Sequence, residues 1–127
     1  MASFTLAPMP TIAPHQDLLR SMYVAFNGRD IPTALLAMHP HVHWPRAWKG
    51  DYVVGHDEVR SYWQQQWQEI NPRVEPTGFA QREDGRVEVA VHQLVKDRQG
   101  QVLFDGPVKH IYTIEAGLVK QMDIEQG

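Results

Sequence analysis

Apolar residues in the first part of the chain recur with the spacing of an amphipathic helix. The positions i, i+3, i+4 and i+7 are occupied by Leu19, Met22, Tyr23 and Phe26, which places these side chains on one face. Gly28 follows this stripe and suits the left-handed residue that commonly ends a helix. The pattern predicts a helix that begins near residue 15 and buries one face.

Two further helices are predicted. Asp30 offers an N-cap and Pro32 suits the first turn of a short helix, which must stop before Pro40. Its apolar residues are Leu35, Leu36 and Met38. A longer helix begins at Gly55 and ends before Pro72. Its apolar stripe consists of Val59, Trp63, Trp67 and Ile70.

The remaining segments carry the signals of strands and turns. A short strand is predicted over residues 41–44, before Pro45. After residue 72 apolar residues alternate with polar ones, and turn residues lie at 84–85, 97–100 and 116–117. The segments 87–91, 102–114 and 118–125 are predicted as strands, the second interrupted by a bulge or edge position at residues 106–107. Three helices followed by a meander of about four long strands indicate an α+β fold.

Length and composition fit one folded domain. A chain of 127 residues with 43% hydrophobic and 21% charged residues should bury roughly two thirds of its unfolded surface. We expect this domain to span residues 15–127. Residues 1–14 are expected to form an extended N-terminal arm, because each proline in it disfavours a helical residue before it. These prolines are Pro8, Pro10 and Pro14.

Charge and cysteine content exclude several classes of protein. The net charge is −3 and the 12 Lys and Arg residues form no basic run, which argues against a nucleic-acid partner. The absence of cysteine excludes disulfides and thiolate metal sites and fits a reducing compartment. No stretch reaches the ~18 consecutive apolar residues of a membrane helix, and the first residues lack the positive charge of a secretory signal. We therefore expect a cytoplasmic protein that binds neither nucleic acid nor a membrane.

Three local features carry a resemblance to a known family. They are the run 26–31 (FNGRDI), the strand 42–45 and Gly55 before the third helix. With the order of elements, they make residues 15–125 resemble the SnoaL-like branch of the nuclear-transport-factor-like superfamily, to which ketosteroid isomerases also belong. The resemblance implies a cone in which a strongly curved sheet, mixed or antiparallel, surrounds an apolar interior. It also implies a homodimer formed through the outer sheet face. Members include isomerases, cyclases, dehydratases and proteins without activity.

The polar positions of the isomerases are mostly apolar in this chain. The oxyanion tyrosine corresponds to Met22, with Tyr23 one residue away, and the general base corresponds to Trp44. The protonated aspartate of the family corresponds to His110, and a further pocket tyrosine corresponds to Trp63. Steroid isomerisation by the family mechanism needs a base beside an oxyanion hole, so we do not expect it here.

His110 is therefore the main candidate for a polar or acid/base group, with Tyr23 as a weaker helper. If His110 points inward, Tyr112 shares its face of the strand, because side chains alternate with a period of two. A histidine in an apolar pocket should be neutral near pH 7. The alternative is a structural histidine whose two ring nitrogens are bonded to the backbone or to a buried carboxylate. The predicted ligand-binding residues are Met22, Trp44, Trp48, Trp63, Tyr112 and Met122.

A second group of histidines raises the question of a metal ion. His41 and His43 point to one side of the predicted strand, and His39 lies close in sequence. Two histidines make an incomplete site, and no glutamate follows at a metalloprotease spacing. A surface cluster is the preferred interpretation, and neither a metal nor a cofactor is expected.

Two hypotheses from different classes follow. The first is a pocket protein that binds a small apolar, cyclic molecule and uses His110 for isomerase, cyclase or dehydratase chemistry. The alternative is a non-catalytic dimeric module with a vestigial pocket. A connected cavity that reaches His110 favours the first, whereas an interior filled by Trp44, Trp63 and Met22 favours the second.

Overall fold

The computed structural model describes residues 15–46 and 49–127. The predicted arm over residues 1–14 and the predicted pocket residue Trp48 lie outside this part. The helices are α1 (Gln16–Asn27), α2 (Ile31–Leu36) and α3 (Gly55–Glu69). The strands are β1 (Met38–Arg46), β2 (Asp51–Val54), β3 (Ile70–Gln81), β4 (Val87–Asp97), β5 (Val102–Glu115) and β6 (Leu118–Gln126). None of the described helices is long and apolar enough to span a bilayer.

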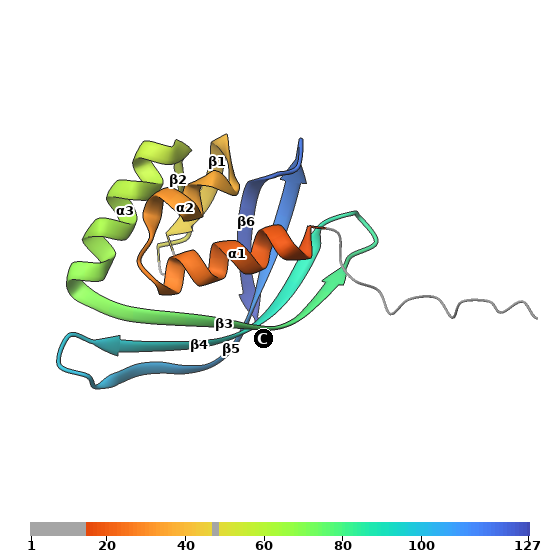
Figure 1. Cartoon of the computed structure of the whole chain (residues 1–127). Helices are drawn as coiled ribbons and strands as arrows, with labels where there is room; N and C mark the ends of the chain where they lie inside the picture. Colours follow the sequence, from red (N-terminus) through yellow and green to blue (C-terminus); the bar gives the residue numbers. More distant parts are fainter. Residues whose placement is uncertain (1–14, 47–48) are drawn as a thin grey trace, which may run out of the picture.

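The strands form one open mixed sheet in the order β2-β1-β6-β5-β4-β3. Strands β1 and β6 are parallel, and the other neighbouring pairs are antiparallel. Figure 1 shows β3 and β4 running in a different direction from β1 and β6, with the sheet bending between them. Shifts of register between Thr113 and Ile114 and between Val95 and Lys96 mark bulges, which bend a sheet. The predicted α+β class and curved mixed sheet are confirmed.

Helix α1 ends at Asn27, directly before Gly28, but its left-handed residue comes one position later than predicted. Gly28 has φ −83°, and the left-handed residue is Arg29 with φ 61°. The amide of Asp30 donates to the carbonyl of Ala25, and that of Arg29 donates to Phe26, which is the bonding of a Schellman cap. Gly28 is instead in close contact, because a Cβ there would lie 3.3 Å from the carbonyl oxygen of Val24. The prediction of a left-handed Gly28 was wrong by one position.

The ends of the next two helices also differ from the predicted ones. Met38 was placed in the second helix, but it begins β1, pairs with Val119 of β6 and is buried. Ile70 was placed in the third helix, but it has the extended φ of −136° and begins β3 without an intervening loop. Strand β3 also continues through Pro72, which an edge strand tolerates because it needs one side of its ladder only. The short strand β2 was not predicted.

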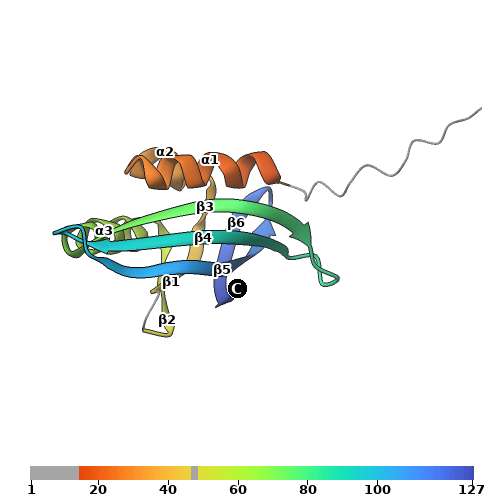
Figure 2. The same cartoon turned by 90° about the horizontal axis from the view of Figure 1, so that it is seen from below.

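The edge of β3 is covered by the end of α1. In Figure 2, β3, β4 and β5 bend together as one layer, and α1 runs alongside β3. The side chain of Asn27 donates to the carbonyl of Val74 over 2.7 Å and accepts from its amide over 2.9 Å. Arg29 donates to the carbonyl of Pro72 over 2.7 Å. These bonds satisfy backbone groups that an open edge would leave unpaired, and they attach the helices to the sheet.

Candidate functional site

A cavity lies between the helices and the inner face of the sheet. Its empty volume, including the opening to solvent, is about 590 Å³, of which about 70 Å³ has room for the centre of a water-sized molecule. Helix α1 contributes Met22, Tyr23 and Phe26 to its wall. Helix α3 contributes Trp63, together with Tyr62 and Gln66.

The floor of the cavity comes from β5 and β6. His110 and Tyr112 of β5 point inward, and both line the cavity. Each faces a lining residue of β6, since His110 pairs with Ile124 and Tyr112 pairs with Met122. This arrangement follows from the period of two along each strand, which turns alternate side chains to the same face.

Three buried polar side chains form a hydrogen-bonded chain across this floor. The Tyr112 hydroxyl donates to the Tyr23 hydroxyl over 2.7 Å. The Tyr23 oxygen lies 2.7 Å from Nδ1 of His110, and the two rings are stacked at an interplanar angle of 11°. Because the Tyr23 oxygen already accepts from Tyr112, its own proton is directed to Nδ1. Helix α1 and strand β5, far apart in sequence, are thus joined inside the cavity.

Burial keeps all three groups uncharged at neutral pH. Desolvation lowers the pKa of His110 to about 4. Desolvation also raises the pKa of Tyr23 and that of Tyr112. A neutral imidazole carries one proton, and acceptance from Tyr23 at Nδ1 places that proton on Nε2. The site therefore presents a neutral N–H donor rather than an imidazolium.

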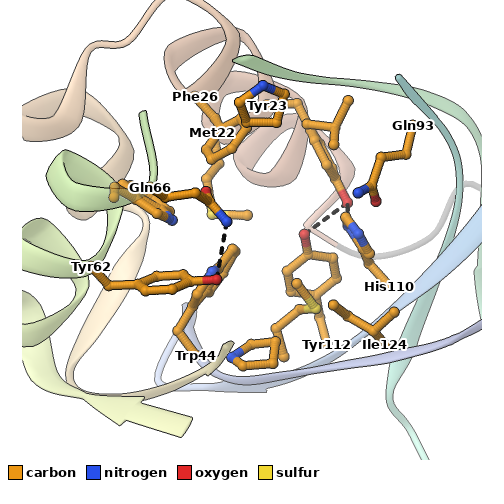
Figure 3. A pocket seen from close by; sticks show the side chains of 15 residues that line it. Met22, Tyr23, Phe26, Trp44, Tyr62, Gln66, Gln93, His110, Tyr112 and Ile124 are labelled. Carbon is orange, nitrogen blue, oxygen red and sulfur yellow. Dashed lines mark hydrogen bonds between the residues drawn. The ribbon is translucent and has the colours of Figure 1, made fainter. Parts of the chain in front are cut away.

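The Nε2 atom of His110 is the free end of this chain. Its ring lines the cavity, and within residues 15–46 and 49–127 its hydrogen bond is made at Nδ1. Figure 3 shows the amide of Gln93 pointing toward the pair formed by Tyr23 and His110. Across the cavity, Gln66 donates to the Tyr62 hydroxyl over 3.0 Å. The cavity thus has polar groups at two sides and an apolar surface between them.

The predicted tryptophan walls are in place around the cavity. The rings of Trp44 and Trp63 meet edge to face at 5.5 Å, and Trp63 stacks on Trp67 at 5.7 Å. Trp63 is 1% exposed, and Trp44 is 8% exposed. Aromatic pairs of this kind contribute to stability beyond the area that they bury, and Trp44 and Trp63 form an apolar wall of the cavity.

The histidines at the start of β1 are arranged along the chain rather than around a point. Nδ1 of His39 accepts from the amide of His41 over 3.0 Å, and Nδ1 of His43 lies 3.1 Å from the carbonyl of His41. His39 also lies 3.4 Å from Glu115. Among the residues that the structure describes, no three His, Cys, Asp or Glu side chains are grouped so as to hold a metal ion.

Of the residues predicted to form the site, the structure brings seven together around the cavity. They are Met22, Tyr23, Trp44, Trp63, His110, Tyr112 and Met122. Sequence reasoning missed Gln93, Tyr62 and Gln66. Gln93 continues the inward alternation of Val89 and Val91, so the period of β4 carried a usable signal. Tyr62 and Gln66 flank Trp63 on α3, and their orientation depends on how that helix is rotated.

An open curved sheet with helices over an apolar cavity defines a cone-shaped α+β fold. The SnoaL-like domain matches residues 19–122. The chain therefore belongs to the SnoaL-like family. No curated protein matches the sequence at a significant level.

Solved structures show the same fold. An NTF2-like protein of unknown function from Burkholderia pseudomallei is 24% identical with a TM-score of 0.78, covering 91% of this chain and 92% of that one. TerC, co-crystallised with polyporic acid, is 24% identical with a TM-score of 0.77 and coverages of 90% and 92%. A "putative polyketide cyclase" from Xanthomonas campestris is 19% identical with a TM-score of 0.71 and coverages of 87% and 87%.

Proposed function

We propose that the protein binds a small, largely apolar, cyclic molecule in this cavity and contacts one of its oxygen atoms through His110. The observation that supports this most strongly is the chain from Tyr112 through Tyr23 to Nδ1 of His110. This chain holds the imidazole in one tautomer and leaves the Nε2 proton for a ligand. A structural histidine would have both ring nitrogens bonded within the protein.

The proposed chemistry is polarisation of a carbonyl or hydroxyl oxygen. A neutral Nε2–H donates a hydrogen bond to the ligand oxygen and stabilises negative charge that develops there, as isomerase, cyclase and dehydratase reactions require. Full proton transfer from Nε2 would be followed by proton shifts from Tyr23 to Nδ1 and from Tyr112 to Tyr23. That leaves a buried Tyr112 phenolate, which the raised pKa of Tyr112 disfavours. We therefore propose His110 as a hydrogen-bond donor first and as an acid or base second.

Binding is tested with 2-naphthol and naphthalene, two probes that differ by one hydroxyl group. Wild-type protein should bind both and prefer 2-naphthol, with polyporic acid as a third probe. His110→Ala should lose about fivefold to tenfold in affinity for 2-naphthol, the equivalent of one hydrogen bond, and should bind naphthalene as before. Equal affinity of wild type and His110→Ala for 2-naphthol would contradict the role of His110.

Catalysis is tested separately from binding. We propose that wild-type protein accelerates exchange of the α-protons of 2-tetralone into D₂O, followed by NMR, and that His110→Ala does not. In this step Nε2–H of His110 donates to the developing enolate oxygen, while a solvent water molecule removes the proton and D₂O returns a deuteron to the same carbon. Binding without acceleration would instead favour the alternative, a non-catalytic binding module.

The assembly and location of the protein are also proposals. We propose one domain over residues 15–127 and a homodimer in the cytoplasm. Val102 and Leu103, 56% and 58% exposed at the start of β5, are apolar surface that a second copy would cover. Sedimentation at high micromolar concentration tests the dimer, and a monomer there would reject it.

A further inference from the structure

A second hollow lies on the other side of β3 and is lined by cations. Its empty volume, including open solvent, is about 450 Å³. The lining residues are Asn27, Arg29, Asn71, Pro72, Arg73, Leu94 and Lys96. They include three cations and no carboxylate, although the whole chain has a net charge of −3. Such a local excess of positive charge favours an anion.

The register of the sheet explains why these side chains meet. Asn71 of β3 pairs with Lys96 of β4, and Arg73 pairs with Leu94, so the four share one face. Pro72 lies between them in sequence, is turned to the inner face and also lines the cavity described above. Figure 1 places the start of β3 and the turn between β4 and β5 at the same end of the molecule. The two hollows are therefore separated by a single strand.

Arg29 is held rigidly at this place. Its guanidinium donates to the carbonyls of Phe26 and Pro72 and to Oδ1 of Asn71. It also lies over the ring of Trp67, with Cζ 4.8 Å from the centroid. A guanidinium has five N–H donors, so these three bonds leave two donors for a ligand. The contacts fix the position of the charge in advance, which reduces the entropy lost on binding.

The neighbouring groups add further donors, and one of the cations, Arg73, is paired with a carboxylate. Because Oδ1 of Asn71 accepts from Arg29, its amide nitrogen is left with two donor hydrogens. Burial lowers the pKa of Arg29, and the positive charges of Arg98 and Arg73 lower it further. Within the described residues, the ion pair at this site is that of Arg73 with Glu75, both on the exposed face of β3.

We propose that Arg29, Asn71, Arg73 and Lys96 form a binding site for a small oxyanion, phosphate or carboxylate. The planar forks of two arginines and the point charge of a lysine suit the oxygens of such groups. Although Pro72 borders both hollows, none of the four binding residues lines the cavity. The proposal therefore does not depend on the function of the cavity.

The test is an NMR titration of the full chain with inorganic phosphate, and with acetate as the carboxylate arm, at constant ionic strength. We expect saturable shifts of the amide signals of Arg29, Asn71 and Lys96. A stronger response to phosphate would assign the site to phosphate groups, and a stronger response to acetate would assign it to carboxylates. Shifts that are scattered over the surface, or that do not saturate, would overturn the proposal.

Three variants make the test specific. Lys96→Gln should weaken phosphate binding about threefold to fivefold, as expected for loss of one partly exposed charge. Glu75→Gln should strengthen it, because Arg73 is released from its ion pair. Lys120→Gln is the matched control, since Lys120 lies on β6 beside Glu115, and it should leave binding unchanged. Equal effects of Lys96→Gln and Lys120→Gln would overturn the proposal, whatever the cavity binds.

Discussion

The hydroxyl oxygen of Tyr23 lies 2.7 Å from Nδ1 of His110, and this bond joins the first helix to the centre of the sheet. The two residues are 87 positions apart in sequence. Both side chains are almost completely buried, with 4% and 5% exposure. A bond of this kind contributes to stability and also decides which ring nitrogen of His110 faces the cavity.

Tyr23→Phe should destabilise the fold while leaving its shape unchanged. The change leaves the Tyr112 hydroxyl without an acceptor and Nδ1 of His110 without a donor, so we expect the free energy of unfolding to fall by about 2 to 4 kcal/mol. Urea denaturation measures this. Tyr52→Phe is the comparison, since Tyr52 is 39% exposed and its hydroxyl donates to Asp123 at the surface, and it should lower the free energy of unfolding by about 1 kcal/mol or less. Equal losses of unfolding free energy in the two variants would show that the buried hydrogen bonds of Tyr23 stabilise the fold no more than those of an exposed tyrosine.

The depressed pKa of His110 predicts a loss of stability in mild acid. The imidazole has its ordinary pKa of 6.5 in the unfolded chain and a pKa of about 4 in the folded protein. The contribution of the neutral, buried His110 to the free energy of unfolding is therefore fully present above pH 6.5. It is lost as the pH falls toward 4, because the unfolded chain takes up the proton at a higher pH than the folded protein does. The loss over this window should be about 3 kcal/mol.

The comparison with His110→Gln isolates this contribution. The rest of the chain is the same in both proteins, so the difference between them in the slope of unfolding free energy against pH between 6.5 and 4 belongs to His110. Wild type should have the steeper slope. Parallel curves would contradict a neutral, buried His110.

Asn27→Ala should loosen the edge of β3. The amide of Asn27 bonds both backbone groups of Val74, and their loss should lower the free energy of unfolding by about 1 to 3 kcal/mol. Hydrogen exchange at the Val74 amide should accelerate more than exchange in the central strands. Gln68→Ala, at an exposed position of α3, is the control and should leave that amide protected. An unchanged Val74 amide in Asn27→Ala would mean that the edge is held by other contacts.

Ile124→Trp should close the cavity without unfolding the protein. Ile124 faces His110 across β5 and β6 and is 40% exposed, so a larger ring can extend over the cavity opening. Calorimetry should show loss of 2-naphthol binding. Leu36→Trp adds the same ring on α2, where Leu36 is 76% exposed and does not line the cavity. Binding that survives in Ile124→Trp, or is lost in both, would place the ligand elsewhere.

The sequence predicted the floor of the site better than its helical wall. Along β5 and β6 the period of two puts His110, Tyr112 and Met122 on one face whatever the details of packing. On α1 the direction of the side chain turns by about 100° from one residue to the next. Met22 and Tyr23 both border the cavity, and the role of each depends on the rotation of the helix about its axis. Nothing local indicates that the Tyr23 hydroxyl meets Nδ1, because that contact is made by the tertiary fold.

The errors at the ends of helices have one physical cause. Met38 and Ile70 each fit two patterns. Each continues the apolar stripe of the preceding helix, and each is also the first inward residue of the following strand. Periodicity alone cannot separate these two states. Pairing with β6 decides for Met38 and pairing with β4 decides for Ile70, and both partners come later in the sequence.

The most direct test of the cavity is an NMR titration of methionine methyl groups with 2-naphthol. Met22 and Met122 line the cavity, whereas Met38 is equally buried and lies outside its lining. The methyl signals of Met22 and Met122 should shift saturably and show contacts to the probe, while the signal of Met38 stays in place. Unchanged signals of Met22 and Met122, or the same response from all three, would contradict a ligand-binding cavity beside His110.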